Sequence, residues 1–197
     1  MGVKLVSSSA GSVELVAPVT ASNYTATMPA GTGTVAVQGV STNIVSGTAV
    51  ASTSGTSIDF TGIPSWVKRI TVMFNGVSTN GTSAIQIQLG SGSFTTSGYV
   101  GGAGRVTTAS AAGSSLTTGF LIAVISAAAD TQNGSFVITN LSGNIWTCQG
   151  SVFSSNYSAT QTGAGLISLG GALDRVRITT SNGTDTFDAG SINILYE

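Results

Sequence analysis

The sequence predicts an all-β protein built from antiparallel sheets, on three observations. Apolar and polar residues alternate with a period of two along much of the chain, whereas helical periodicity is almost absent. Asn-Gly dipeptides, which favour tight turns, follow or interrupt several of the alternating runs. We therefore expect an extended N-terminal β segment over residues 1–45, a linker over residues 46–55, and an antiparallel, jelly-roll-like β-sandwich over residues 56–197.

The extended segment comes first. Residues 1–45 contain few large apolar side chains and two prolines, Pro18 and Pro29, which favour edge or extended positions. A segment of this size and composition cannot readily bury a core alone. We expect it to pack against copies of itself or against a larger particle. Residues 46–55 are rich in Ser, Thr, Gly and Ala, a composition typical of linkers.

The remaining chain contains five alternating runs. Because successive side chains of a strand point to opposite faces, each run predicts a half-buried strand. Their expected core residues are Ile70, Val72 and Phe74; Ile85, Ile87 and Leu89; Phe136 and Ile138; Val176 and Ile178; and Ile192, Ile194 and Tyr196. The continuous apolar run over residues 120–125 predicts a central strand buried on both faces, with a short helix as the alternative.

Glycine marks the expected turns and loops. Four dipeptides predict turns: Asn75-Gly76, Asn80-Gly81, Asn133-Gly134 and Asn182-Gly183. Two glycine-rich stretches, residues 101–104 and 163–165, have the composition of phosphate-binding loops. Neither is followed by the Gly-Lys-Ser/Thr motif that such loops require. We expect both to be flexible loops.

Composition narrows the function classes. Hydrophobic residues make up 41% of the chain, enough for a core, whereas charged residues make up only 7% and leave a net charge of −1. The six Lys and Arg are scattered, which argues against nucleic-acid binding. The longest apolar run, residues 120–129, is too short to cross a bilayer, and no signal peptide is recognisable at the start. We expect no membrane insertion.

Catalytic chemistry has few candidates. The chain has no His, which excludes Ser-His-Asp and Cys-His arrangements and the usual zinc sites. The single Cys148 predicts a small buried side chain. Asp185 and Asp188 flank a predicted turn, where Asp commonly bonds to nearby backbone; a calcium site is the alternative. We predict a protein that is not an enzyme, with no catalytic residue, no metal and no cofactor.

Three aromatic residues are candidates for contact with a receptor or a glycan. Tyr99 and Tyr157 are expected on loops beside Gly and Ser, and Trp146 follows a predicted turn. Aromatic rings that carry a hydroxyl or N–H group can stack on sugars and anchor protein contacts. The alternative is that Trp146 caps the core and that the two tyrosines lie on loops without a binding role. Trp66 is expected at a domain or subunit junction.

Three segments resemble bacteriophage tail-fibre and virion fibre proteins. They are residues 17–35, with Ala17-Pro18, Tyr24-Thr25 and Met28-Pro29-Ala30; residues 58–78, with Ile58-Asp59-Phe60-Thr61-Gly62-Ile63-Pro64; and residues 182–194 at the C-terminal end. The resemblance covers both ends of the chain and the start of the main domain, and leaves residues 90–169 unmatched. It implies a virion location, a homotrimer and a role in attachment or display.

The sequence therefore supports a trimeric fibre or fibre-tip adhesin. Residues 1–45 would bind other virion proteins of the tail, neck or capsid, and the sandwich would present a surface to a host glycan or protein. One alternative is a fibre that decorates the capsid or neck. Another is a stand-alone, lectin-like module. A depolymerase is disfavoured, because no pair of carboxylates is positioned for it.

Overall fold

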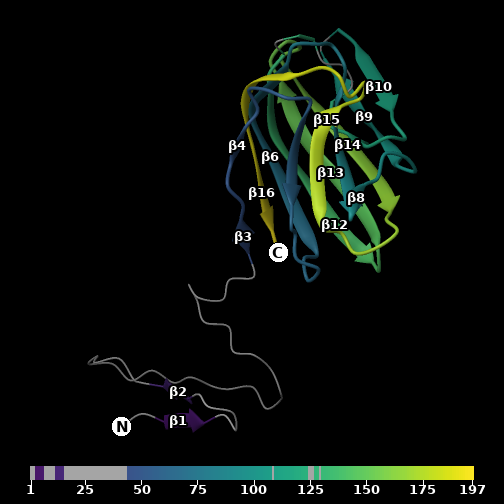
Figure 1. Ribbon diagram of the computed structural model, residues 1–197. Coiled ribbons are helices and arrows are strands. Elements are labelled where there is room, and N and C mark those ends of the chain that lie inside the picture. Colours follow the sequence, from purple (N-terminus) through teal and green to yellow (C-terminus); the bar gives the residue numbers. More distant parts are fainter. Residues whose placement is uncertain (1–2, 7–11, 16–43, 108, 124–126, 129) are drawn as a thin grey trace. The chain divides into compact units, whose positions relative to one another are not determined.

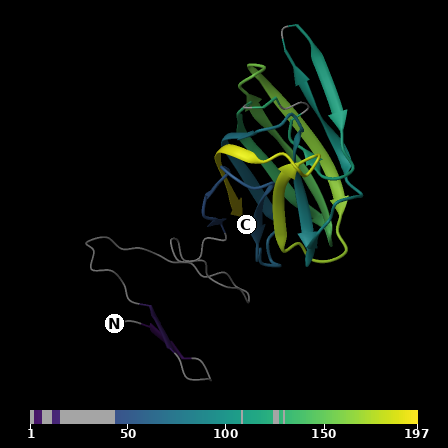
Figure 2. The ribbon, with the colours of Figure 1, turned by 45° about the horizontal axis from the view of Figure 1, so that its top comes forward.

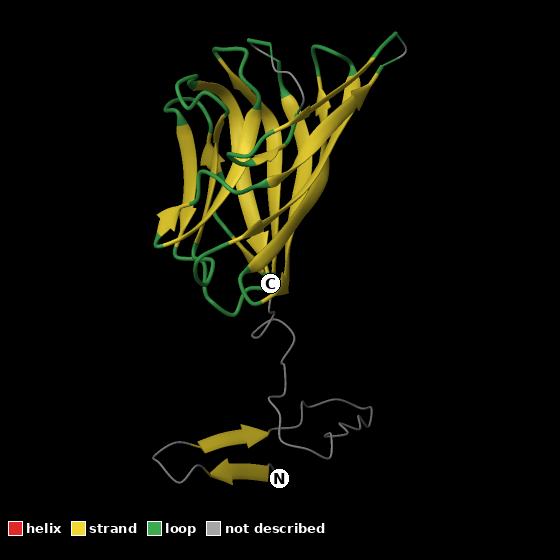
Figure 3. Ribbon diagram, turned by 90° about the vertical axis from the view of Figure 1, so that its right-hand side faces the viewer, coloured by secondary structure: helices red, strands yellow, loops and turns green. Residues whose placement is uncertain are grey.

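The computed structural model describes residues 3–6, 12–15, 44–107, 109–123, 127–128 and 130–197. The chain divides into two units, Met1–Val37 and Gln38–Glu197. In the first unit, β1 (Val3–Val6) pairs antiparallel with β2 (Ser12–Leu15) (Figure 1). Every other described element is a strand of the second unit, and the described residues contain no helix (Figure 3). The prediction of an all-β protein with antiparallel sheets is confirmed.

The larger sheet of the second unit has nine strands, and all neighbours in it are antiparallel. Their order is β10 (Ala111–Ser115), β9 (Val100–Val106), β14 (Ala159–Ser168), β13 (Ile145–Ser154), β12 (Gln132–Ser142), β6 (Arg69–Thr79), β16 (Phe187–Tyr196) and β3 (Val45–Ser46), with β4 (Val50–Ala51) also on β16. The β9–β10 hairpin forms one edge (Figure 2).

The smaller sheet has five strands and is also antiparallel. Its order is β11 (Phe120–Leu121), β7 (Ile85–Ser91), β15 (Arg175–Thr180) and β5 (Ser57–Thr61), with β8 (Ser93–Phe94) also on β7. Residues from both sheets form one hydrophobic cluster, so the sheets enclose a common core.

The alternating runs explain this core. The predicted inward residues of β6, β7, β12, β15 and β16 are buried, and only Tyr196 at the chain end is partly exposed. Gln86 and Gln88, on the opposite face of β7, are buried as well. Thr118 covers them: its hydroxyl donates to Gln86 Oε1 (2.8 Å), and its carbonyl accepts from Gln88 Nε2 (2.9 Å). Both faces of β7 are therefore covered.

The apolar run over residues 120–125 is not a long central strand. Only Phe120 and Leu121 form a strand, at the edge of the smaller sheet beside β7. Residues 120–123 are nonetheless buried, and β11 also contacts β9 and β14 of the larger sheet. The run is apolar because it fills the gap between two sheet edges. Residues 124–126 lie outside the described part of the chain.

Both predicted glycine-rich loops are strands, which corrects the prediction. Residues 101–104 belong to β9 and residues 163–165 to β14, and the two stretches pair with each other, Gly101 with Gly165 and Ala103 with Gly163. A Cβ on Gly163 would lie 2.4 Å from the Leu121 carbonyl oxygen, and one on Gly165 would lie 2.9 Å from the Phe120 ring. Glycine here lets β11 lie directly on the larger sheet.

Two Asn-Gly dipeptides also lie inside strands. Asn75-Gly76 is part of β6 and Asn133-Gly134 is part of β12, where the β6–β12 register shifts. Gly76 has φ +62° and lies against Gly190 of β16, where that register shifts too. These dipeptides therefore form bulges rather than turns. Asn182-Gly183 is a turn as predicted, with φ +69° at Gly183.

The segment predicted as a linker lies along the edge of the larger sheet. β3 and β4 both pair with β16, Gly47 N–H donates to the Ile194 carbonyl (2.8 Å), and the buried Ser52 hydroxyl donates to the Ala189 carbonyl (2.8 Å). Small residues suit this position because they lie close to the β16 backbone. Of the segment expected to be extended, residues 16–43 lie outside the described part of the chain.

The close approach of the β6 and β16 backbones at Gly76 and Gly190 gives a stability prediction. A Cβ at Gly190, where φ is +91°, would lie 2.4 Å from the Gly76 carbonyl oxygen. We expect Gly190→Ala to destabilise the fold by more than about 3 kcal/mol, because left-handed strain adds to a backbone clash. Gly183→Ala is the control: φ is also positive there, but nothing lies within 4 Å of the new Cβ. It should cost only about 1 kcal/mol in urea unfolding. Equal losses would contradict the bulge packing.

Candidate functional site

Tyr99 is a core residue and not a loop contact. Its side chain is only 2% exposed, and its hydroxyl accepts a hydrogen bond from Leu89 N–H (2.7 Å) and donates to the Thr95 carbonyl (3.1 Å). Its ring lies edge-on to Phe120, with 4.9 Å between centroids. The phenol therefore fastens the residues before β9 to the middle of the smaller sheet. In this fold it cannot reach a receptor.

Trp146 is also buried, in β13, and belongs to the core cluster. The alternation of β13 explains this, because Trp146, Cys148 and Val152 share its inward face. Trp66, in contrast, is about half exposed, and its ring centroid lies 6.0 Å from that of Tyr196. The expectation of a surface contact at Trp146 is therefore wrong for this fold.

Tyr157 is the one predicted contact residue that is partly exposed. It lies in the turn between β13 and β14, and its ring covers the Arg105 guanidinium with 3.6 Å between Cζ and the ring centroid. Arg105 is 8% exposed, and its Nε and Nη1 atoms have no hydrogen-bond partner in the described part of the chain. The cation is held by an aromatic face. Tyr99, Trp146 and Tyr157 do not form one surface site.

The acidic side chains hold loops together. Asp185 accepts from Asn182 Nδ2 (2.6 Å) and from Ser83 N–H (3.0 Å), and these bonds lower the pKa of its carboxyl group. Asp188 accepts from the Ser78 hydroxyl. The buried Asp130 accepts four hydrogen bonds, from Gln132, Ser154, Ser155 and Asn156. The described residues contain no group of three or more side chains suited to hold a metal ion, and no helix long and apolar enough to cross a membrane.

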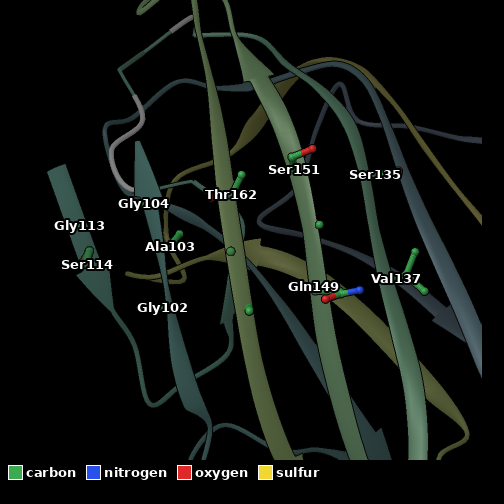
Figure 4. Close-up of a pocket in the computed structure, with 13 residues that line it drawn as sticks. Gly102, Ala103, Gly104, Gly113, Ser114, Ser135, Val137, Gln149, Ser151 and Thr162 are labelled. Carbon is green, nitrogen blue, oxygen red and sulfur yellow. The ribbon is translucent and has the colours of Figure 1, made fainter. Parts of the chain in front are cut away.

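A broad hollow lies on the outer face of the larger sheet and has a volume of about 790 Å³. Five neighbouring strands form it: β12, β13, β14, β9 and β10 (Figure 4). We call it the outer-face trough. Its lining side chains are small or uncharged: Gly102, Ala103, Gly104, Gly113, Ser114, Ser135, Val137, Gln149, Gly150, Ser151, Thr162, Gly163 and Ala164.

The strand register explains the shape of the trough. Outward residues of adjacent strands form rows that cross the sheet, and the two central rows are Ser135, Ser151, Thr162, Gly104 and Gly113, and then Val137, Gln149, Ala164 and Gly102. These side chains make the floor, and all but Val137 and Gln149 are short. Two residues further along, larger apolar side chains stand on β13 and β9 in one direction and on β14 and β9 in the other, with Thr160 or Thr147 on the neighbouring strand.

These apolar side chains form two ridges along the trough. Phe153 and Val106 stand on one side, and Val100 and Leu166, which are register partners, stand on the other. All four are exposed, at 46%, 75%, 69% and 38% respectively. A floor of small residues between two apolar ridges is a shaped surface, whereas apolar residues on an ordinary surface are scattered singly.

Charge is absent from the outward side of the trough strands, whereas the smaller sheet carries it, and so does the larger sheet at Arg69 and Glu197. The five strands of the trough contain one charged residue, Arg105, and it is buried on the opposite side. The outer face of the smaller sheet carries Asp59 and Arg177 in a two-bond ion pair (2.8 and 2.7 Å), with Arg177 also 4.0 Å from the Phe94 ring centroid. The hydrogen bonds to Asp59 raise the pKa of Arg177. The smaller sheet thus presents the face suited to water.

Comparisons of the chain with protein-family models, with curated proteins and with solved structures find no match. The trough was not predicted from the sequence. Its signal was present in the glycine-rich residues 101–104 and 163–165, which have the composition of loops but occupy two neighbouring strands.

Tyr99 yields the prediction for this region. Tyr99→Phe keeps the ring but leaves Leu89 N–H unpaired in the core, so we expect a loss of about 1–3 kcal/mol at neutral pH in urea unfolding. Burial also raises the pKa of Tyr99 to about 12. An unfolded tyrosine ionises near pH 10, so the folded state holds this proton more tightly, and stability should fall as pH rises from about 10 to 12.

The variant should lose less stability than the wild type over that alkaline range, because it has no phenol to ionise at this site. An identical alkaline decline in both proteins would contradict the buried position of Tyr99. Tyr157→Phe, at a partly exposed ring, provides the matched control.

Proposed function

We propose that the protein is a structural component of a bacteriophage particle, a homotrimeric fibre or fibre-tip adhesin with a jelly-roll-like sandwich. The observation that carries the proposal is the outer face of the five trough strands, which holds no charged side chain and has two apolar ridges, whereas the smaller sheet carries ion pairs. A protein that functions as a single copy has no need of such a face, whereas a fibre subunit is covered by neighbours. The resemblance of residues 17–35, 58–78 and 182–194 to fibre proteins supports it.

In this proposal residues 1–45 attach the chain to other proteins of the tail, neck or capsid. The second unit is displayed to the host. Tyr157 is the contact candidate that remains at the surface, with Arg105 beneath its ring. A single partly exposed ring gives weak contact, and several copies acting together supply the avidity.

A lectin-like module is the second candidate, and the smaller sheet favours it. A polar hollow of about 290 Å³ there is lined by Gln86, Gln88, Thr118 and Arg177, among others. Amides, hydroxyls and a guanidinium are the groups that bind sugar hydroxyls. The two glutamines already bond to Thr118 and Thr180, however, which leaves few free donors for a sugar.

Solution mass and cell binding together test the proposal. On a sizing column with light scattering, the full chain should have about three times the mass of one 19.5 kDa chain. Labelled protein should bind intact bacterial cells, and Tyr157→Ala should weaken that binding at least about tenfold, which corresponds to about 1.4 kcal/mol, without a change in mass.

Immuno-electron microscopy of particles from the phage that encodes the chain should place it on the virion. A monomer that binds soluble glycans would favour the lectin-like module instead. A chain that is absent from the particle would contradict the proposal. Thr61→Ala, at an exposed position of the smaller sheet, is the control for cell binding.

A further inference from the structure

We infer that the outer-face trough and its two ridges are the surface through which one copy of this chain contacts a second copy. The inference rests on the proposed function only for the presence of several copies in one assembly. It assigns the contact to β9, β10, β12, β13 and β14 of the second unit, and not to residues 1–45.

The first argument is electrostatic. The chain has six Lys or Arg and seven Asp or Glu, and the five strands hold only Arg105 among them. Along a strand with one solvated face, apolar and polar residues alternate, and the charged residues lie on the solvated face. A face without charge can be covered by an identical face without burying an unpaired ion. It is therefore compatible with a copy of itself.

The second argument is shape. Phe153 and Val106 form one ridge, Val100 and Leu166 form the other, and the floor between them consists of Gly, Ala, Ser and Thr with Val137 and Gln149 toward β12. The surface contains both the protruding part and the hollow that can receive it. A ridge from one copy can lie in the trough of another, where absent side chains allow close approach of the backbones. Each copy would then offer a ridge to one neighbour and receive a ridge from another, a head-to-tail contact that can close into a ring such as a trimer.

The third argument is the edge of the sheet. β10 is the edge strand beside β9, it is mostly exposed, and it contains no charged residue and no proline. An uncovered, uncharged edge is a site for pairing with another chain, and natural proteins protect such edges. A second copy seated across the trough would cover β10 along with the ridges.

The size of the face fits a stable contact. Strands of the observed lengths, with about 3.4 Å per residue and about 4.8 Å between strands, give a face of roughly 700 Å². A standard interface buries about 800 Å² on each partner. A neutral glycan would suit the hydroxyl groups of the floor but would find only one aromatic ring, Phe153, among the ridge residues. The apolar ridges therefore favour a protein partner over a sugar.

A lysine at the centre of the floor tests the inference. Thr162 is exposed in the central row, and Thr162→Lys in the full chain places a charge where the second copy would lie. We expect self-association to weaken at least tenfold, measured as the concentration at which the oligomer dissociates in light scattering. Thr61→Lys, at an exposed position of β5 in the smaller sheet, should leave the oligomer unchanged.

A cross-link reads out the contact directly, whatever else holds the oligomer together. The only native cysteine, Cys148, is buried, so an introduced thiol is the accessible one. Thr162→Cys should give covalent dimers with a short bis-maleimide at low protein concentration, and Thr61→Cys should not. This readout also serves if Thr162→Lys fails to fold.

The outcomes separate the inference from the proposed function. An oligomer that persists in Thr162→Lys and gives no cross-link through Thr162→Cys overturns the inference, and the fibre proposal is then decided by its own tests, cell binding and location on the particle. A wild-type chain that remains monomeric at all concentrations overturns the inference and the trimeric fibre together. A monomer that binds a neutral polysaccharide, with binding lost in Thr162→Lys, would assign the trough to a glycan instead.

Discussion

The shared core between the two sheets is the constraint on which the rest of the structure depends. Ile70, Val72 and Phe74 of β6 are almost wholly buried in it, and β6 is also the strand that pairs with both β12 and β16. Because side chains alternate along a strand, burying one face fixes which residues form the other. The register that places Phe136 and Ile138 inside therefore places Ser135 and Val137 outside, in the trough. The outer face follows from the core.

Because the chain has few charged residues, the place of each one in the fold is informative. In a chain with 7% charged residues, ion pairs are confined to a few places: Asp59 with Arg177, Asp174 with Arg175, and Arg69 with Glu197 among the described residues. None of these lies on β9, β10, β12, β13 or β14. The pKa of Asp174 is lowered mainly by its hydrogen bonds to Arg175. Exposed pairs of this kind contribute little stability. Arg69 and Glu197 lie at the ends of β6 and β16, so the larger sheet also carries an ion pair, outside the five trough strands.

Period-two patterns were enough to predict the class of the fold and most core strands, because Ile, Val and Phe at alternate positions place one apolar face on a strand but not on a helix. They could not predict the sheet order, which depends on pairings between distant residues such as Arg105 and Gln161. Glycine was the main source of error. Local sequence does not distinguish a glycine that turns the chain from one that admits a neighbour, as Gly163 admits Leu121. Two of the three aromatic candidates, Tyr99 and Trp146, are buried, because a glycine or a turn just before a ring does not show whether that ring lies at the surface or in the core.

The same glycines connect the core to the trough. Gly163 and Gly165 let β11 close onto the inner side of β14, while Gly102 and Gly104, one strand away, lower the floor on the outer side. Larger side chains at Gly163 and Gly165 would occupy the space that β11 takes on the inner side of the sheet. Larger side chains at Gly102 and Gly104 would fill the trough on the outer side. Small residues on both faces make this part of the larger sheet thin, and the backbone atoms under the trough have no protein atoms packed against their outer side. Covering it from outside supplies such contacts, which is the physical reason to expect a partner there.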